Sequence, residues 1–172
     1  MKDVTDKNFG VLIAFWLPGF LLLWGLSYSS DEIATWLAKP SVKDAPTIGG
    51  FLYATLASLA LGLLISAIRW LVVDSFLHHV TGLTYPDIDF AKLKDKDAFA
   101  VFQGAVENHY RYYQYYSNTL VAVIGAFGFY IYARGLPSFL TWCVVIAIGV
   151  ALLLASRDCL NNYYKRVAEI AA

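Results

Sequence analysis

Four long apolar stretches, separated by polar segments, dominate the sequence. They cover residues 9–28, 48–73, 118–133 and 138–155. An α-helix needs about 20 apolar residues to cross the hydrocarbon core of a bilayer. The third stretch is shorter than this, but the tyrosines that precede it can sit in the membrane interface. The pattern therefore predicts an all-α integral membrane protein, a single membrane domain with four transmembrane helices.

The last two apolar stretches belong to helices that are longer than a bilayer is thick. Proline is absent from residues 97–133 and from residues 138–170, and only residues 134–137 separate the two runs. A helix of about 37 residues is roughly 55 Å long, whereas the hydrocarbon core is about 30 Å thick. We therefore expect helices three and four to form a long antiparallel hairpin, with a turn centred near residue 136 and a cytoplasmic stalk.

The ends and breaks of the other helices follow from local signals. Pro18 and Gly19 fall within the first apolar stretch, where we expect a kink or a functional break. That stretch is too long for the core of a cleaved signal peptide, so we expect it to remain as a span. Ser30 is placed to cap a short interfacial helix that ends before Pro40. We expect the second long helix to continue until Gly82.

The positions of the lysines and arginines predict the orientation. Ten of these residues fall on the side that holds both termini, and three fall on the other side. Cytoplasmic segments of membrane proteins carry an excess of Lys and Arg. We therefore expect both termini in the cytoplasm, together with residues 74–117 and the tail 156–172.

The composition supports a lipid environment and argues against several functions. Hydrophobic residues make up 59% of the chain and charged residues 15%, compared with about 25% charge in soluble domains. The formal net charge is zero, which argues against duplex nucleic acid as a partner. Cys143 and Cys159 lack the spacing of a redox or zinc motif. Asp74 and His78 share a helix face, but three histidines are too few for a membrane di-iron site. We therefore expect no metal and no cofactor.

A dense polar segment covers residues 107–118. Its polar side chains recur at helical spacing, so they share one face of the predicted helix. In the predicted hairpin this face meets polar residues of helix four, while Arg69 and Asp74 lie at a similar depth. The candidate residues are Glu107, His109, Arg111, Gln114, Asn118, Arg157, Asp158, Asn161, Arg69 and Asp74.

Three interpretations of this cluster remain open. In the first, the residues form a ladder that joins the stalk helices, with Glu107 near Lys165 and Gln114 near Asp158. In the second, they bind a ligand or a lipid headgroup. In the third, they form a catalytic site, although the chain has no hydrolase elbow, Walker loop or dinucleotide loop. We expect no catalytic residues and no enzyme activity, and we expect the neighbouring tyrosines to form an interfacial girdle.

Stripes of small residues mark the apolar helices. Small side chains at every fourth position let helix backbones approach closely in a membrane. Helix two carries Gly50, Ala54, Ser58, Gly62 and Ser66, helix three carries Asn118, Ala122 and Ala126, and helix four carries Cys143, Ala147, Ala151 and Ala155. The stripes either pack the helices of one chain together or form contacts between subunits. In the second interpretation, the hydroxyls of Ser58 and Ser66 line a narrow pathway.

Two motifs resemble those of small bacterial four-span proteins. One is the polar segment 107–118, and the other is the Leu17-Pro18-Gly19-Phe20 break. The plan of the chain also resembles the compact inner-membrane effectors of bacterial anti-phage systems. That resemblance implies a protein that permeabilises or depolarises the inner membrane, and the small-residue stripes, the polar stalk face and the lack of catalytic motifs favour a homo-oligomeric, channel-like form of it. The resemblance also implies control by a cytoplasmic signalling enzyme, or by its small-molecule or nucleotide product.

Two further hypotheses belong to other classes. The chain is either a membrane enzyme that acts on lipid headgroups, with Glu107, Arg111 and Asp158 among its polar residues, or a scaffold. A scaffold would anchor a soluble partner through the loop at residues 85–96.

Overall fold

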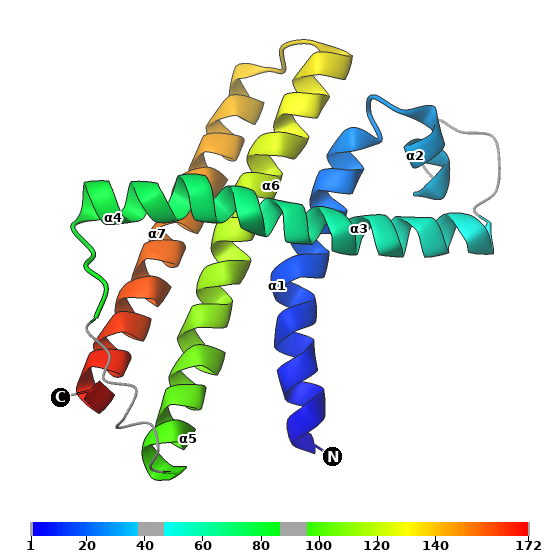
Figure 1. Ribbon diagram of the computed structural model, residues 1–172. Helices are drawn as coiled ribbons and strands as arrows, with labels where there is room; N and C mark the ends of the chain where they lie inside the picture. The colour runs from blue at the N-terminus through cyan, green and yellow to red at the C-terminus, as the bar shows by residue number, and fades with distance from the viewer. Residues whose placement is uncertain (1, 38–46, 87–95, 172) are drawn as a thin grey trace.

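The computed structural model describes residues 2–37, 47–86 and 96–171, and every regular element in these ranges is a helix (Figure 1). The elements are α1 (Lys2–Leu26), α2 (Asp31–Trp36), α3 (Ile48–Arg69), the π-helix η1 (Trp70–Asp74), α4 (Ser75–Thr81), α5 (Lys96–Ala105), the π-helix η3 (Val106–Tyr110), α6 (Arg111–Arg134) and α7 (Phe139–Ala171). The all-helical prediction is confirmed for this part of the chain.

Within the described residues, three helical runs are long and apolar enough to cross a membrane. They are Ile48–Thr81, Phe99–Arg134 and Phe139–Glu169. A shorter apolar helix covers Leu12–Leu26. The side chains of the three long runs are mostly exposed in the single chain, which is the expected state of surfaces that face lipid.

Local side-chain chemistry sets where several helices begin and end. The Ser30 hydroxyl accepts a hydrogen bond from the Ile33 amide and caps α2. The Thr47 hydroxyl accepts one from the Gly50 amide at 3.0 Å and caps α3. Gly82 has a φ of 66°, a left-handed conformation that suits glycine and ends α4. The predicted cap at Ser30 and the predicted stop at Gly82 are confirmed.

The long helices are not all aligned. In Figure 1, α6 and α7 lie side by side and run in opposite directions, with residues 135–138 between them, and α1 lies next to α6. The continuous run α3–η1–α4 instead crosses over these three helices. The sequence predicted the length of this run but not its direction. The N- and C-termini lie at the same end of the structure.

Two glycines allow α3 to cross α1 at very short range. A Cβ atom added to Gly19 would collide with the backbone carbonyl of Ser58, and one added to Gly62 would collide with the carbonyl of Phe15. The two backbones therefore touch directly, as small residues allow in membrane helices. Ser58 is fully buried here and donates a hydrogen bond to the carbonyl of Ala54 at 2.6 Å.

These contacts fit the interpretation that the stripe on helix two packs the helices of one chain. Gly50, Ala54, Ser58 and Gly62 are buried, and Ser66 is half-buried. The stripe on α7 behaves differently, because Cys143, Ala147 and Ala151 are exposed in the single chain.

A hydrogen bond from α6 compensates for the proline in α1. Pro18 has no N–H, so the carbonyl of Ala14 lacks its usual helical donor. The Asn118 side-chain amide donates to this carbonyl at 2.8 Å, and both groups are buried. Asn118 was predicted to face helix four, and that prediction is wrong. α1 is one continuous helix through Pro18.

We expect Asn118→Leu to lower the free energy of unfolding in detergent by about 1–3 kcal/mol, because a buried carbonyl loses its donor. Pro18→Ala restores an N–H at position 18, which gives the Ala14 carbonyl a partner within α1. Asn118→Leu should therefore cost less in the Pro18→Ala background, which a double-mutant cycle measures. Equal costs in both backgrounds would contradict this account.

Candidate functional site

A buried ion pair lies where the continuous run α3–η1–α4, which we call the transverse run, meets α6. Arg69 Nη1 donates to Asp74 Oδ1 at 3.0 Å, and Arg69 is only 4% exposed. The two residues are five apart in sequence. The π-helical turn of η1 lies between them, and its i→i+5 spacing brings such residues onto one face. Both residues, which the sequence placed at a similar depth to the polar segment, contact Tyr113 of α6.

Tyr113 of α6 completes this pair. Its hydroxyl donates to Asp74 Oδ1, and its ring lies beneath the guanidinium of Arg69, with Arg69 Cζ 5.1 Å from the ring centroid. Tyr113 is fully buried in a cluster that includes Leu77 of α4 and Leu160 of α7. The sequence assigned it to an interfacial girdle. Its position on one helix face with Leu120, which is also buried, is the signal that distinguishes it from its neighbours.

His78 extends the contacts to α7. Its Nδ1 lies 2.6 Å from the carbonyl oxygen of Asp74, so Nδ1 carries a proton. Its Nε2 lies 3.0 Å from the hydroxyl of Tyr164, which donates when the ring is neutral. The ring stacks on Tyr85 with centroids 4.2 Å apart and planes 13° apart. We call Arg69, Asp74, His78, Tyr113 and Tyr164 the polar junction.

Among the described residues, Gln114 and Asp158 do not form the hydrogen bond that the predicted polar ladder between α6 and α7 required. The predicted register agrees with the contact between Tyr110 and Tyr163, whose ring centroids are 5.1 Å apart. That contact is aromatic. Asp158 instead accepts a hydrogen bond from Asn162 on its own helix at 3.2 Å. Arg157, Asp158 and Lys165 are exposed on α7, and Gln114 and Asn161 are half-buried.

The shared polar face of α6 turns toward α1. Asn118 donates to α1, as described above, and Arg111 lies against the backbone of Gly10. A Cβ atom added to Gly10 would lie 2.8 Å from Arg111 Nη1. The helical spacing therefore predicted correctly that these residues share a face. It did not predict which neighbouring helix that face meets, because α6 lies between two helices.

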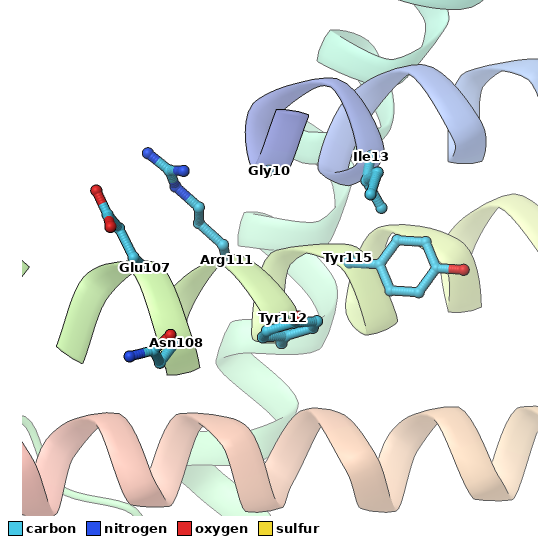
Figure 2. Close-up of a pocket in the computed structure, with 7 residues that line it drawn as sticks. All are labelled: Gly10, Ile13, Glu107, Asn108, Arg111, Tyr112 and Tyr115. Atoms are coloured by element: carbon cyan, nitrogen blue, oxygen red, sulfur yellow. The ribbon is translucent and has the colours of Figure 1, made fainter. Parts of the chain in front are cut away.

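A cleft of ≈ 290 Å³ lies on this face (Figure 2). Its lining consists of Gly10, Ile13, Glu107, Asn108, Arg111, Tyr112 and Tyr115. Figure 2 shows Glu107, Asn108 and Arg111 at one end of the cleft and Ile13 and Tyr115 at the other. The cleft is therefore polar at one end and largely apolar at the other. His109, a neighbouring candidate, is half-buried in η3.

Two of the three histidines, His78 and His79, are engaged with their own helix. His78 and His79 each place Nδ1 near a carbonyl oxygen one turn earlier, at 2.6 Å and 2.7 Å. No group of three or more His, Cys, Asp or Glu side chains suited to a metal ion occurs among the described residues. The loop proposed to anchor a partner, residues 85–96, lies largely outside those residues.

Comparison of the chain with models of known protein families, with curated proteins and with solved structures gives no match.

Proposed function

We propose that the chain is a bacterial inner-membrane effector that acts as a homo-oligomer and makes the membrane permeable under the control of a cytoplasmic signal or partner. The polar junction carries this proposal. Ionisable residues within membrane spans are energetically costly, and they are usually found where function needs them. Here the junction ties the transverse run to α6 through Tyr113 and to α7 through Tyr164. A movement of the ends of α6 and α7 that lie beside the two termini in Figure 1 would therefore be transmitted directly to α3–α4.

The proposal includes four membrane crossings, with α6 and α7 as a hairpin whose lower part forms a cytoplasmic stalk. The common end at which both termini lie supports this topology, as does the Lys and Arg distribution. Since α3–α4 crosses over the other helices, it must be tilted relative to them. The run is 34 residues and therefore about 51 Å long, which is enough to cross a core of about 30 Å at a steep tilt.

The permeable path would lie between subunits. Within one chain, the hydroxyl of Ser58 is packed against α1 and bonded to its own helix, so it does not line an opening. α7 is the least covered of the three candidate spans, with 6% of its most apolar segment buried, compared with 28% and 22% for the others. Its small residues Cys143, Ala147 and Ala151 would let a second copy approach closely.

Reconstitution tests the proposal. Native mass spectrometry is expected to give one defined oligomer, and liposomes that contain the protein should release K⁺ faster than protein-free liposomes. Tyr113→Phe removes one hydrogen bond to a charged group while it keeps the ring. We expect it to leave the oligomer intact and to change the K⁺ flux by about tenfold. A strictly monomeric protein without ion flux, alone or with cytoplasmic extract, would overturn the proposal.

A second candidate function, an enzyme that acts on lipid headgroups, draws support from the cleft in Figure 2, which contains Glu107 and Arg111. Asp158, the third residue of that hypothesis, is exposed on α7. Alanine at Glu107 or Arg111 would abolish a lipid product in this case and would leave the oligomer and its ion flux unchanged.

A further inference from the structure

The cleft of Figure 2 lies where the helices change from apolar to polar. Beyond its apolar end, Ala14 and Asn118 are buried in the contact between α1 and α6, and α6 continues as a candidate span. Its polar end belongs to η3 and to the first turn of α6. The polarity of the cleft therefore runs along the helices, in the same direction as the polarity of a lipid in its leaflet.

The charged groups of the cleft are opposite in sign and one helical turn apart. Glu107 and Arg111 are four residues apart in sequence, and side chains at this spacing lie about 5–6 Å apart at Cβ. Both side chains already take part in interactions. A guanidinium has five N–H donors and a carboxylate about four acceptor positions, so each can serve a ligand as well.

The Arg111 guanidinium is held between two helices. Gly10 has no side chain, which leaves the space beside the α1 backbone that Arg111 occupies. Figure 2 shows the Arg111 side chain reaching from α6 toward the helix that carries Gly10. A group positioned in this way pays less conformational entropy when a ligand arrives.

We propose that this cleft binds the headgroup of a phospholipid that carries both a phosphate and a primary ammonium. The phosphate binds Arg111, the ammonium binds Glu107, and the acyl chains leave the cleft past Ile13. A short ethylene bridge joins the two charges of such a headgroup, so one headgroup can reach two side chains that lie one helical turn apart. Tyr112 and Tyr115 occupy the interface, where tyrosine is favoured. This inference goes beyond the proposed function and does not depend on ion flux.

Lipid binding is measured by native mass spectrometry of the protein released from nanodiscs. The nanodiscs contain equal amounts of lipids with ethanolamine, choline and glycerol headgroups. We expect the wild-type protein to retain the ethanolamine lipid about tenfold more than the choline lipid, whose methylated ammonium cannot donate hydrogen bonds to Glu107. Glu107→Gln should lose this preference and keep phospholipid binding. Arg111→Gln should lower the retention of all three lipids.

Two further variants separate binding from folding. Gly10→Ala adds a methyl group that displaces only the flexible end of Arg111, so we expect a folded protein with weaker lipid retention. Arg157→Gln removes an exposed cation from α7, outside the cleft, and should bind as the wild type does. Free phosphoethanolamine is the competitor. Displacement of the bound lipid by this competitor shows that the headgroup alone is recognised. Lipid that stays bound shows that the acyl chains add to the binding.

Equal retention of the three lipids by the wild type would overturn the proposal, as would Glu107→Gln and Arg111→Gln variants that bind like the Arg157→Gln control. Ion flux is measured separately on the same samples. Loss of headgroup preference with normal flux, or flux failure with normal preference, therefore assigns the failure to one proposal alone.

Discussion

Gly62→Leu is expected to abolish the packing of α3 on α1, with almost no folded protein recovered after extraction in detergent. Even the first atom of a side chain at this position would collide with the backbone carbonyl of Phe15. A flexible side chain can move away from a collision, but a helix backbone can do so only if the whole helix moves. The cost should therefore exceed the roughly 1–3 kcal/mol of ordinary overpacking. Size-exclusion chromatography and near-ultraviolet circular dichroism measure the recovery.

Two other helical glycines are matched controls. Gly104 and Gly128 both have open space where a Cβ atom would be added. Alanine at either position should be tolerated or should stabilise the helix by roughly 0.5–1 kcal/mol, because alanine loses less conformational freedom on folding. Gly62→Ala already introduces the Cβ atom that collides with the Phe15 carbonyl, so it should lower the stability clearly more than Gly128→Ala does. Similar stability of these two variants would show that the helices do not cross in contact.

Asp74→Asn is expected to lower the free energy of unfolding by about 3–5 kcal/mol, because it leaves the guanidinium of Arg69 buried without its counter-charge. The matched control is Glu169→Gln. Glu169 pairs with Arg166 at 3.1 Å, nearly the same distance as in the buried pair, but both side chains are more than 60% exposed. An exposed pair of this kind contributes about 0–1 kcal/mol. Denaturant titration in detergent compares the two variants.

Removal of both charges separates two effects of Asp74→Asn: the cost of leaving the Arg69 charge unpaired, and the loss of the bond between Arg69 and Asp74. The double variant Arg69→Met with Asp74→Leu leaves no unpaired charge, and it should be more stable than Asp74→Asn. It should still lose the regulated ion flux if the polar junction transmits the signal. An Asp74→Asn protein as stable as the Glu169→Gln control would contradict the structure of the junction.

Features set by neighbouring residues could be predicted from the sequence. The cap at Ser30, the stop at Gly82 and the uninterrupted α7 each depend on a few adjacent positions and their backbone preferences. The sharing of one helix face by Glu107, Arg111 and Asn118 likewise follows from helical geometry alone.

Features set by contacts between distant segments could not be predicted in the same way. The stripe that contains Gly62 indicated close packing, but not that the helices cross or that Gly19 lies on the other side of the contact. Asn118 has the spacing of a stalk residue, yet its partner is the carbonyl freed by Pro18 on another helix. The role of Tyr113 depends on a carboxylate 39 residues earlier in the chain. Each of these contacts needs the path of the whole chain.

If the run α3–η1–α4 spans the bilayer as proposed, its crossing over α1, α6 and α7 has a consequence for the lipid around the protein. When parallel helices meet a thinner membrane, they shorten their hydrophobic span by tilting together. Helices that cross cannot do this, because a rotation that shortens the span of one set lengthens the span of the other. With the proposed topology, the chain would have one preferred hydrophobic thickness, and lipids of other acyl lengths would deform around it.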